Sequence, residues 1–138
     1  MKYEHLLKQH HLKATPQRIA IIDLMEHAGH ISIDELYRSI RKSFSSISLA
    51  TLYKNIHSMM EAALIREVKI PGHKARYEIE KGSHTHILCK ACGDLKDIPV
   101  DPVSLVDSGG LDTGRYQVDD VSLLLCGTCP ECQERQND

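Results

Sequence analysis

Apolar residues in the first half of the chain recur at the three- and four-residue spacing of helices. A short helix is predicted over residues 2–10, with two leucines as its apolar residues. Three longer helical patterns follow, and their predicted core stripes are Ile19, Ile22 and Met25; then Leu36 and Ile40; then Leu49, Leu52, Ile56, Met59 and Met60. The pattern therefore predicts an N-terminal region built mainly from helices.

Capping residues mark the expected ends of these helices. Thr15 suits an N-cap because a proline follows it at the first helical position, and Gly29 suits the C-terminal end. Ser32 and Glu35 have the Ser-x-x-Glu spacing of a capping box, and Ser48 is placed to cap the last helix. Each helix thus has its own start signal.

The periodicity then changes to that of strands. Residues 64–70 and 75–79 read as two strands on either side of a turn containing Pro71 and Gly72. Three helices followed by a hairpin are the order of a winged helix-turn-helix, so this fold is predicted for residues 1–79.

Residues 80–83 are polar and contain Gly82, which predicts a hinge. Beyond it the pattern predicts two strands, a short helix stopped early by Gly109 and Gly110, and a longer strand, over residues 85–89, 95–100, 102–110 and 115–125. We therefore expect an α+β protein, with a winged helix-turn-helix domain followed by a small α/β domain over residues 84–138.

Composition narrows the function classes. No run of about 18 apolar residues is present, so no membrane span is expected, and the charged N-terminus does not resemble a secretory signal. A cytoplasmic protein is expected. Residues 1–72 hold 10 Lys/Arg and 7 Asp/Glu, whereas residues 73–138 hold 7 and 12. The basic first half permits nucleic-acid binding, and the acidic second half suits cations.

All five cysteines lie in the second half, within the segments CKAC and CGTCPEC. Two Cys-x-x-Cys units offer the four thiolates of one closed, structural zinc site. The pattern leaves open which pair of Cys126, Cys129 and Cys132 contributes to it. Buried unliganded thiols or a redox pair are the alternative interpretations.

Two histidines form a second candidate metal site. His84 and His86 point to the same side if they lie on a strand, while Cys89 has the opposite parity. Asp97 lies on the following strand and can return to the histidines. These ligands are therefore expected to serve a different metal from the cysteines, and a mixed His and carboxylate set suits Fe(II), Mn(II), Zn(II) or Ni(II).

The predicted last helix of the winged helix-turn-helix is a candidate recognition helix. Small polar and apolar groups near its start suit contacts with base edges, from Ser48, Ala50, Thr51 and Tyr53. Phosphate contacts are expected from Lys13, Arg18 and Lys54. An ordinary solvated helix face is the alternative, and the predicted wing favours nucleic-acid binding.

Four segments together resemble the ferric uptake regulator (Fur) family of metal-dependent repressors: LKATPQR, SISLATLYKNI, HTHILCKACGDLKD and CGTCPEC. The resemblance runs from about Lys13 to the last cysteine. It implies a homodimer that binds palindromic operators in double-stranded DNA through the winged helix and dimerises through the C-terminal domain.

The resemblance also implies the metal ligands. Structural zinc would be bound by Cys89, Cys92, Cys129 and Cys132, which leaves Cys126 as a strand residue outside the site. A regulatory Fe(II) or Mn(II) would be bound by His30, Glu78, His84, His86 and Asp97. Residues from both sides of the hinge would then share one ion, whose binding sets the angle between the two domains and favours operator binding.

Asp97 favours the peroxide-responsive PerR branch, because iron sensors of the family usually carry Glu at this position. In that branch peroxide oxidises ligand histidines and releases DNA, and the resemblance implies His30 and His84 as the oxidised residues. Glu78 departs from this branch, since a shorter Asp is common there. Iron- or zinc-responsive repression therefore remains an alternative, and a metal store or chaperone is a third possibility.

An enzyme is less favoured. A zinc deaminase needs His-x-Glu and Pro-Cys-x-x-Cys, whereas this chain has His84-Thr85-His86 and no proline before Cys89 or Cys129. A thioredoxin-like enzyme needs its Cys-x-x-Cys near a βαβ unit, which the helical first half does not offer.

Overall fold

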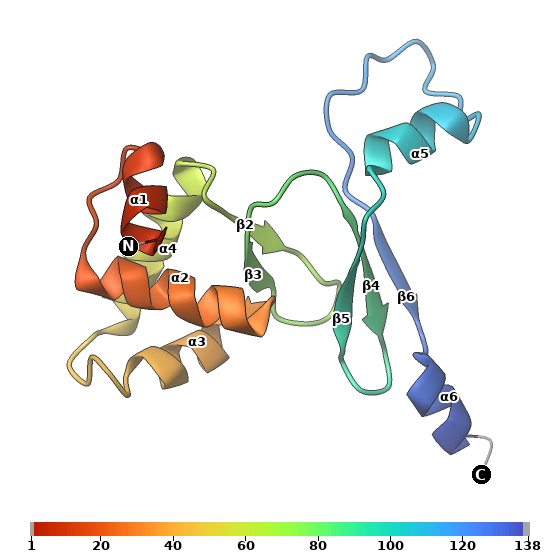
Figure 1. Ribbon diagram of the computed structural model, residues 1–138. Helices are drawn as coiled ribbons and strands as arrows, with labels where there is room; N and C mark the ends of the chain where they lie inside the picture. The colour runs from red at the N-terminus through yellow and green to blue at the C-terminus, as the bar shows by residue number, and fades with distance from the viewer. Residues whose placement is uncertain (1, 137–138) are drawn as a thin grey trace. The chain divides into compact units, whose positions relative to one another are not determined.

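The computed structural model describes residues 2–136 (Figure 1). Internal contacts divide the chain into two compact units, of which the first ends at Lys81 and the second begins at Gly82. The hinge over residues 80–83 and the roles given to the segments on either side of it stay predictions. Among the described residues, no helix is long and apolar enough to cross a membrane.

The first unit packs four helices with a small antiparallel sheet (Figure 1). The helices are α1 (Lys2–Gln9), α2 (Pro16–Ala28), α3 (Ile33–Ile40) and α4 (Leu49–Glu61). The strands are β1 (Ile31–Ser32), β2 (Ile65–Val68) and β3 (Arg76–Ile79), in the order β1-β3-β2. The predicted helices and hairpin are confirmed, whereas the two-residue strand β1 was not foreseen.

Side-chain caps start the helices where the sequence predicted. The Arg18 backbone N–H donates to Thr15 Oγ1 at 3.3 Å, and the Thr51 N–H donates to Ser48 Oγ at 3.1 Å. The Glu35 N–H donates to Ser32 Oγ at 3.3 Å. These bonds satisfy backbone donors that a helix start leaves unpaired, and so fix the first residue of α2, α3 and α4.

The predicted apolar stripes meet in one core. Its completely buried residues include Leu7, Ile21, Ile22, Met25, Leu36, Ile40, Leu52 and Met59. One prediction was wrong: Leu49 is 42% exposed although its spacing places it on the same face as Leu52 and Ile56. It is the first residue of α4, and a helical side chain leans toward the N-terminal end, so Leu49 reaches past the end of the buried stripe. Leu49 therefore belongs to the solvent-facing start of the helix.

The second unit contains a three-stranded sheet and two short helices (Figure 1). Its elements are β4 (Thr85–Cys89), β5 (Leu95–Ile98), α5 (Pro102–Ser108), β6 (Leu124–Gly127) and α6 (Pro130–Gln136). β4 lies in the centre, antiparallel to β5 and parallel to β6. Together the two units confirm the α+β class.

The strand predicted over residues 115–125 was wrong in extent, because β6 begins only at Leu124. Leu124 pairs with His86 on β4, and β4 begins one residue earlier at Thr85. In the described sheet β6 pairs with β4, so residues before 123 would run past the start of that strand. The helix α6, which carries the buried Cys132, was not predicted.

The early stop of α5 is confirmed. Its last residue is Ser108, and the Gly109 N–H donates to the Leu105 carbonyl at 2.9 Å. Gly110 then has φ +70°, a conformation that suits glycine. The glycine pair therefore limits this helix to two turns.

Candidate metal centres

Four cysteines meet at one end of the second unit. Cys89 ends β4, Cys92 lies in the turn after it, and Cys129 and Cys132 lie before and within the start of α6. Their Sγ atoms all lie within 4.8 Å of one another, and Cys92 Sγ is 3.9 Å from Cys129 Sγ. Sulfurs bound tetrahedrally at about 2.3 Å from zinc are roughly 3.8 Å apart, so the donor set fits this ion.

Backbone donors surround the first of these sulfurs. The Cys129 N–H donates to Cys89 Sγ at 3.3 Å, and the Cys92 N–H donates to the same sulfur at 3.5 Å. These hydrogen bonds lower the pKa of Cys89 to about 6. Cys132 has the opposite environment, since its hydrogen bond to Cys129 and its burial raise its pKa to about 12. At neutral pH a metal ion would therefore bind Cys89 as a thiolate and would displace a proton from Cys132.

Cys126 is not part of this cluster. It lies on β6 and is exposed, as the family resemblance implied for a strand residue outside the site. The ambiguity that spacing left is thereby reduced, because Cys129 and Cys132 are the pair that lies beside Cys89 and Cys92. Zinc binding by the four thiols stays a prediction.

Three further donors converge in the second unit. The register of β4 and β5 pairs His86 with Asp97, and His86 Nε2 lies 3.4 Å from Asp97 Oδ1. His84 Nε2 lies 3.5 Å from the same oxygen and 3.0 Å from His86 Nε2. Both imidazoles are buried. The side chains therefore meet as strand parity predicted, although His84 itself precedes β4.

The orientation of His84 suits a metal ligand. Its Nδ1 lies 2.9 Å from the Gly82 carbonyl, which can only accept, so Nδ1 carries the proton. Nε2 is then left with a lone pair directed at His86 and Asp97. A backbone carbonyl that holds one imidazole nitrogen while the other faces the donor set is the usual arrangement around protein-bound metals.

Two donors meet in the first unit. β1 pairs with β3 so that Ile31 lies opposite Tyr77, and one further step along the ladder brings His30 beside Glu78. His30 Nε2 is 2.8 Å from Glu78 Oε2, and Glu78 is completely buried. The short strand β1, which the sequence did not reveal, thus creates this His30–Glu78 pair.

The start of α4 presents most of the candidate DNA-contacting residues. Ser48, Ala50, Tyr53 and Lys54 are exposed, and Thr51 is half-buried with its hydroxyl 2.9 Å from that of Ser48. A helix face that exposes small groups and a phenol near its N-terminus can contact base edges in a major groove.

Arg18 has a more structural setting than the sequence suggested. Its Nε donates to Asn55 Oδ1 at 3.2 Å, and one terminal nitrogen donates to the Lys13 carbonyl at 3.0 Å. The guanidinium thus links α2 to α4, while the Lys13 side chain is exposed. Asn55, which had no assigned role, is part of this link.

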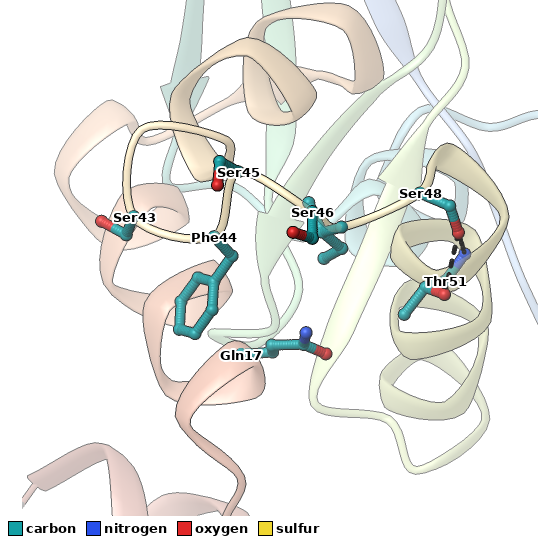
Figure 2. Close-up of a pocket in the computed structure, with 8 residues that line it drawn as sticks. Gln17, Ser43, Phe44, Ser45, Ser46, Ser48 and Thr51 are labelled. Carbon is teal, nitrogen blue, oxygen red and sulfur yellow. Dashed lines mark hydrogen bonds between the residues drawn. The ribbon is translucent and has the colours of Figure 1, made fainter.

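A hydroxyl-rich pocket of about 400 Å³ lies beside the start of α4 (Figure 2). Figure 2 shows it between Gln17 on α2 and the loop 43–48, which supplies four serines and Phe44. Hydroxyl and amide side chains commonly contact DNA phosphates. The sequence marked this loop only as a helix break, although its run of serines was the available signal.

Known proteins resemble this chain over most of its length. The model of the ferric uptake regulator family matches residues 9–125. The peroxide operon regulator of Bacillus subtilis (strain 168) is 27% identical over 132 residues, covering 95% of this chain and 91% of that protein. The solved structure of the Campylobacter jejuni peroxide stress regulator is 33% identical, with a TM-score of 0.68, and covers 96% of this chain and 100% of that one. The Vibrio cholerae ferric uptake regulator is 26% identical, with a TM-score of 0.71, and covers 91% and 98%.

Proposed function

We propose that this protein, which belongs to the ferric uptake regulator family, is a metal-dependent transcriptional repressor that binds DNA as a homodimer. Family membership confirms the resemblance seen in the motifs and makes the protein a regulator rather than an enzyme. A protein acting on DNA works where the DNA is, which fits the cytoplasmic location expected from the sequence.

DNA binding is assigned to the first unit. The start of α4 would enter the major groove, with Ser48, Ala50, Thr51 and Tyr53 near base edges. Lys13 and Lys54 would contact phosphates, with Arg18 holding α2 against α4 as well. A two-fold dimer presents two such helices, so the expected operator is a palindrome with half-sites about one helical turn apart.

Zinc is assigned to the four-cysteine cluster. Two tight turns bring the thiols of Cys89 and Cys92 against those of Cys129 and Cys132, which leaves no position for substrate. Such a closed site stabilises structure. We expect it to hold α6 against the end of β4 and so to support the surface used for dimerisation.

The regulatory ion is assigned to the two remaining donor groups. The His30–Glu78 pair comes from the first unit, and His84, His86 and Asp97 come from the second. We propose that both groups bind one Fe(II) or Mn(II), a choice that the mixed imidazole and carboxylate donors suit. An ion shared in this way would restrict the angle between the units and favour the DNA-binding arrangement.

Asp97 is the observation that carries the peroxide-sensing assignment. One oxygen of its short carboxylate lies within 3.5 Å of both buried imidazoles, and peroxide regulators are among the similar proteins. Bound iron would supply the electrons that convert hydrogen peroxide into an oxidant. The imidazoles of His30 and His84 would then receive the oxygen and lose their hold on the ion, which weakens DNA binding.

An iron-responsive repressor is the second candidate, and Glu78 favours it. This position carries the longer carboxylate that the resemblance associates with iron sensors. The two candidates differ in their response to peroxide and not in their fold or donor atoms. A chemical test is therefore needed to separate them.

The test begins with duplexes selected from a random pool by the Mn(II)-loaded dimer. Selected sequences should be inverted repeats, and their binding should weaken steeply with salt. Peroxide should abolish binding by the Fe(II)-loaded protein while one oxygen atom is added at His30 or His84, and the Mn(II)-loaded protein should be unaffected. Retained DNA binding with unchanged histidine masses would instead support the iron sensor.

Asp97→Glu provides the matched comparison. Its longer carboxylate should keep metal and DNA binding but slow histidine oxidation by roughly tenfold or more, if access of peroxide to the ion depends on the short side chain. Oxidation at the wild-type rate in this variant would remove the main reason for placing the protein among peroxide sensors.

A further inference from the structure

The wing hairpin places an arginine directly opposite a buried glutamate. The register of β2 and β3 pairs Arg66 with Glu78, so the two side chains project from the same face. Arg66 Nε lies 3.5 Å from Glu78 Oε1. Glu80 follows two residues later on the same face, with its Oε1 3.8 Å from an Arg66 terminal nitrogen. Arg66 is therefore positioned between two carboxylates.

The two oxygens of Glu78 have different neighbours. Oε2 is 2.8 Å from His30 Nε2, whereas Oε1 lies on the side of Arg66. Glu78 is completely buried, and the Arg66 side chain is 35% exposed. Because the carboxylate is buried, the nearby guanidinium compensates part of its charge.

We propose that Arg66 is a positioning residue for the regulatory metal, which holds Glu78 Oε1 and leaves only Oε2 to bind the ion. This inference rests on the proposed function, since it assigns Glu78 as a metal ligand. A glutamate restricted to one donor oxygen behaves as a shorter carboxylate does at such a site. Arg66 would then explain how a chain with Glu78 can still leave a coordination position open for peroxide.

The charge of Arg66 acts in the same direction. A guanidinium near a divalent cation repels it, and in a partly buried site that repulsion is poorly screened. Arg66 is therefore expected to weaken metal binding while it orients the ligand. If Arg66 merely stabilised the hairpin, removing it would loosen the site and weaken metal binding.

The test measures Mn(II) binding to the zinc-loaded, full-length dimer at one mildly alkaline pH, from the electron paramagnetic resonance of free Mn(II). Arg66→Gln should tighten binding by about tenfold, because it frees Oε1 as a second donor oxygen and removes a positive charge near the ion. Arg66→Lys keeps the charge and should stay within about threefold of wild type. Arg38→Gln, which removes an exposed arginine of α3, is the matched control and should change nothing.

A double-variant cycle separates positioning from a general charge effect. Aspartate in place of Glu78 is too short to be held from Arg66, so Arg66→Gln should tighten binding by less than about threefold in the Glu78→Asp background. An equal gain in both backgrounds would show that Arg66 acts only as a nearby charge, and the proposal would be overturned.

The remaining outcomes distinguish the two levels of inference. Unchanged or weaker Mn(II) binding in Arg66→Gln, with normal binding by wild type, overturns the role of Arg66 and leaves the proposed function intact. Wild-type protein that binds no Mn(II), or whose affinity is the same after Glu78→Gln, overturns the regulatory site and the role of Arg66 with it.

Discussion

The two units are stabilised by different chemistry. The first contains one apolar core, in which leucine, isoleucine and methionine side chains from α1 to α4 are completely buried. In the second, the buried residues include Leu88 and Leu95 but also two histidines and two cysteines. Small domains with little apolar core usually need a metal or a partner chain. The second unit is therefore expected to depend on both.

Exposed apolar residues show the same contrast. In the described part of the chain, large apolar side chains that remain exposed are concentrated in the second unit, at Ile87, Val100, Leu105, Leu111, Tyr116, Val118 and Leu125. Ile87 and Leu125 are paired across β4 and β6, so they share one face of the sheet. A dimer partner covering this face would supply the burial that the unit lacks alone.

The largest expected effect comes from removing one thiol of the cluster. Cys132→Ser removes one of the four thiols and should abolish stable zinc binding. The effect on folding should be large, because structural zinc contributes roughly 10 kcal/mol or more in small domains. Amide hydrogen exchange should then show lost protection in β4, β5 and β6, while α2 and α4 remain protected. Loss of protection in both units alike would contradict the inference that zinc stabilises only the second unit.

Cys126→Ser is the control for this experiment. Cys126 is exposed and lies outside the cluster, so zinc content and exchange should match wild type. Zinc loss in this variant would mean that Cys126 is a zinc ligand and that the four-cysteine assignment is wrong.

A truncation in the first unit should have a smaller but clear effect. Leu52 is completely buried, so Leu52→Ala should lower the free energy of unfolding of this unit by about 2–5 kcal/mol. Leu49→Ala, three residues earlier on α4 and 42% exposed, should cost less than about 1 kcal/mol. Thermal unfolding followed by circular dichroism compares the two, and equal losses would show that Leu49 is part of the core after all.

The sequence predicted the first unit better than the second, and the reason is physical. Helical periodicity, caps such as Thr15 and Ser48, and the Pro71-Gly72 turn are local signals that act within a few residues. The burial of Ile21 and the strand β1 depend on the packing of distant segments, so local patterns did not reveal them. The exposure of Leu49 likewise follows from its place at a helix start.

The second unit was predicted where chemistry constrains it. Ligand spacing identified the Cys-x-x-Cys turns, and strand parity separated His86 from Cys89. The extent of β6 was mispredicted because it is set by where its neighbour β4 begins, which residues 115–123 do not encode. The contact of Arg66 with Glu78 was missed because it depends on the hairpin register.

The dependence of the second unit on zinc can also be tested by the number of protons that zinc binding releases. Cys89 has a pKa of about 6, so above that pH it is already a thiolate and zinc displaces fewer than four protons from the cluster. Below about pH 6 Cys89 is protonated, and the number released per zinc should rise by about one. Calorimetry in buffers of different ionisation enthalpy measures this number. The Cys126→Ser variant should give the same values, and a constant proton count across this pH range would contradict the lowered pKa.

The smallest expected effect is the loss of one cap on the candidate recognition helix. Ser48→Ala removes the acceptor of the Thr51 N–H, which should cost about 1 kcal/mol in the first unit. Ser46→Ala, in the same loop but without a capping bond among the described contacts, should cost less than about 0.5 kcal/mol. Chemical denaturation of the metal-free protein measures both losses. Zinc content, measured separately on the zinc-loaded protein, should be unchanged because the loss is confined to the first unit. A change in zinc content would show that the two units are not stabilised independently.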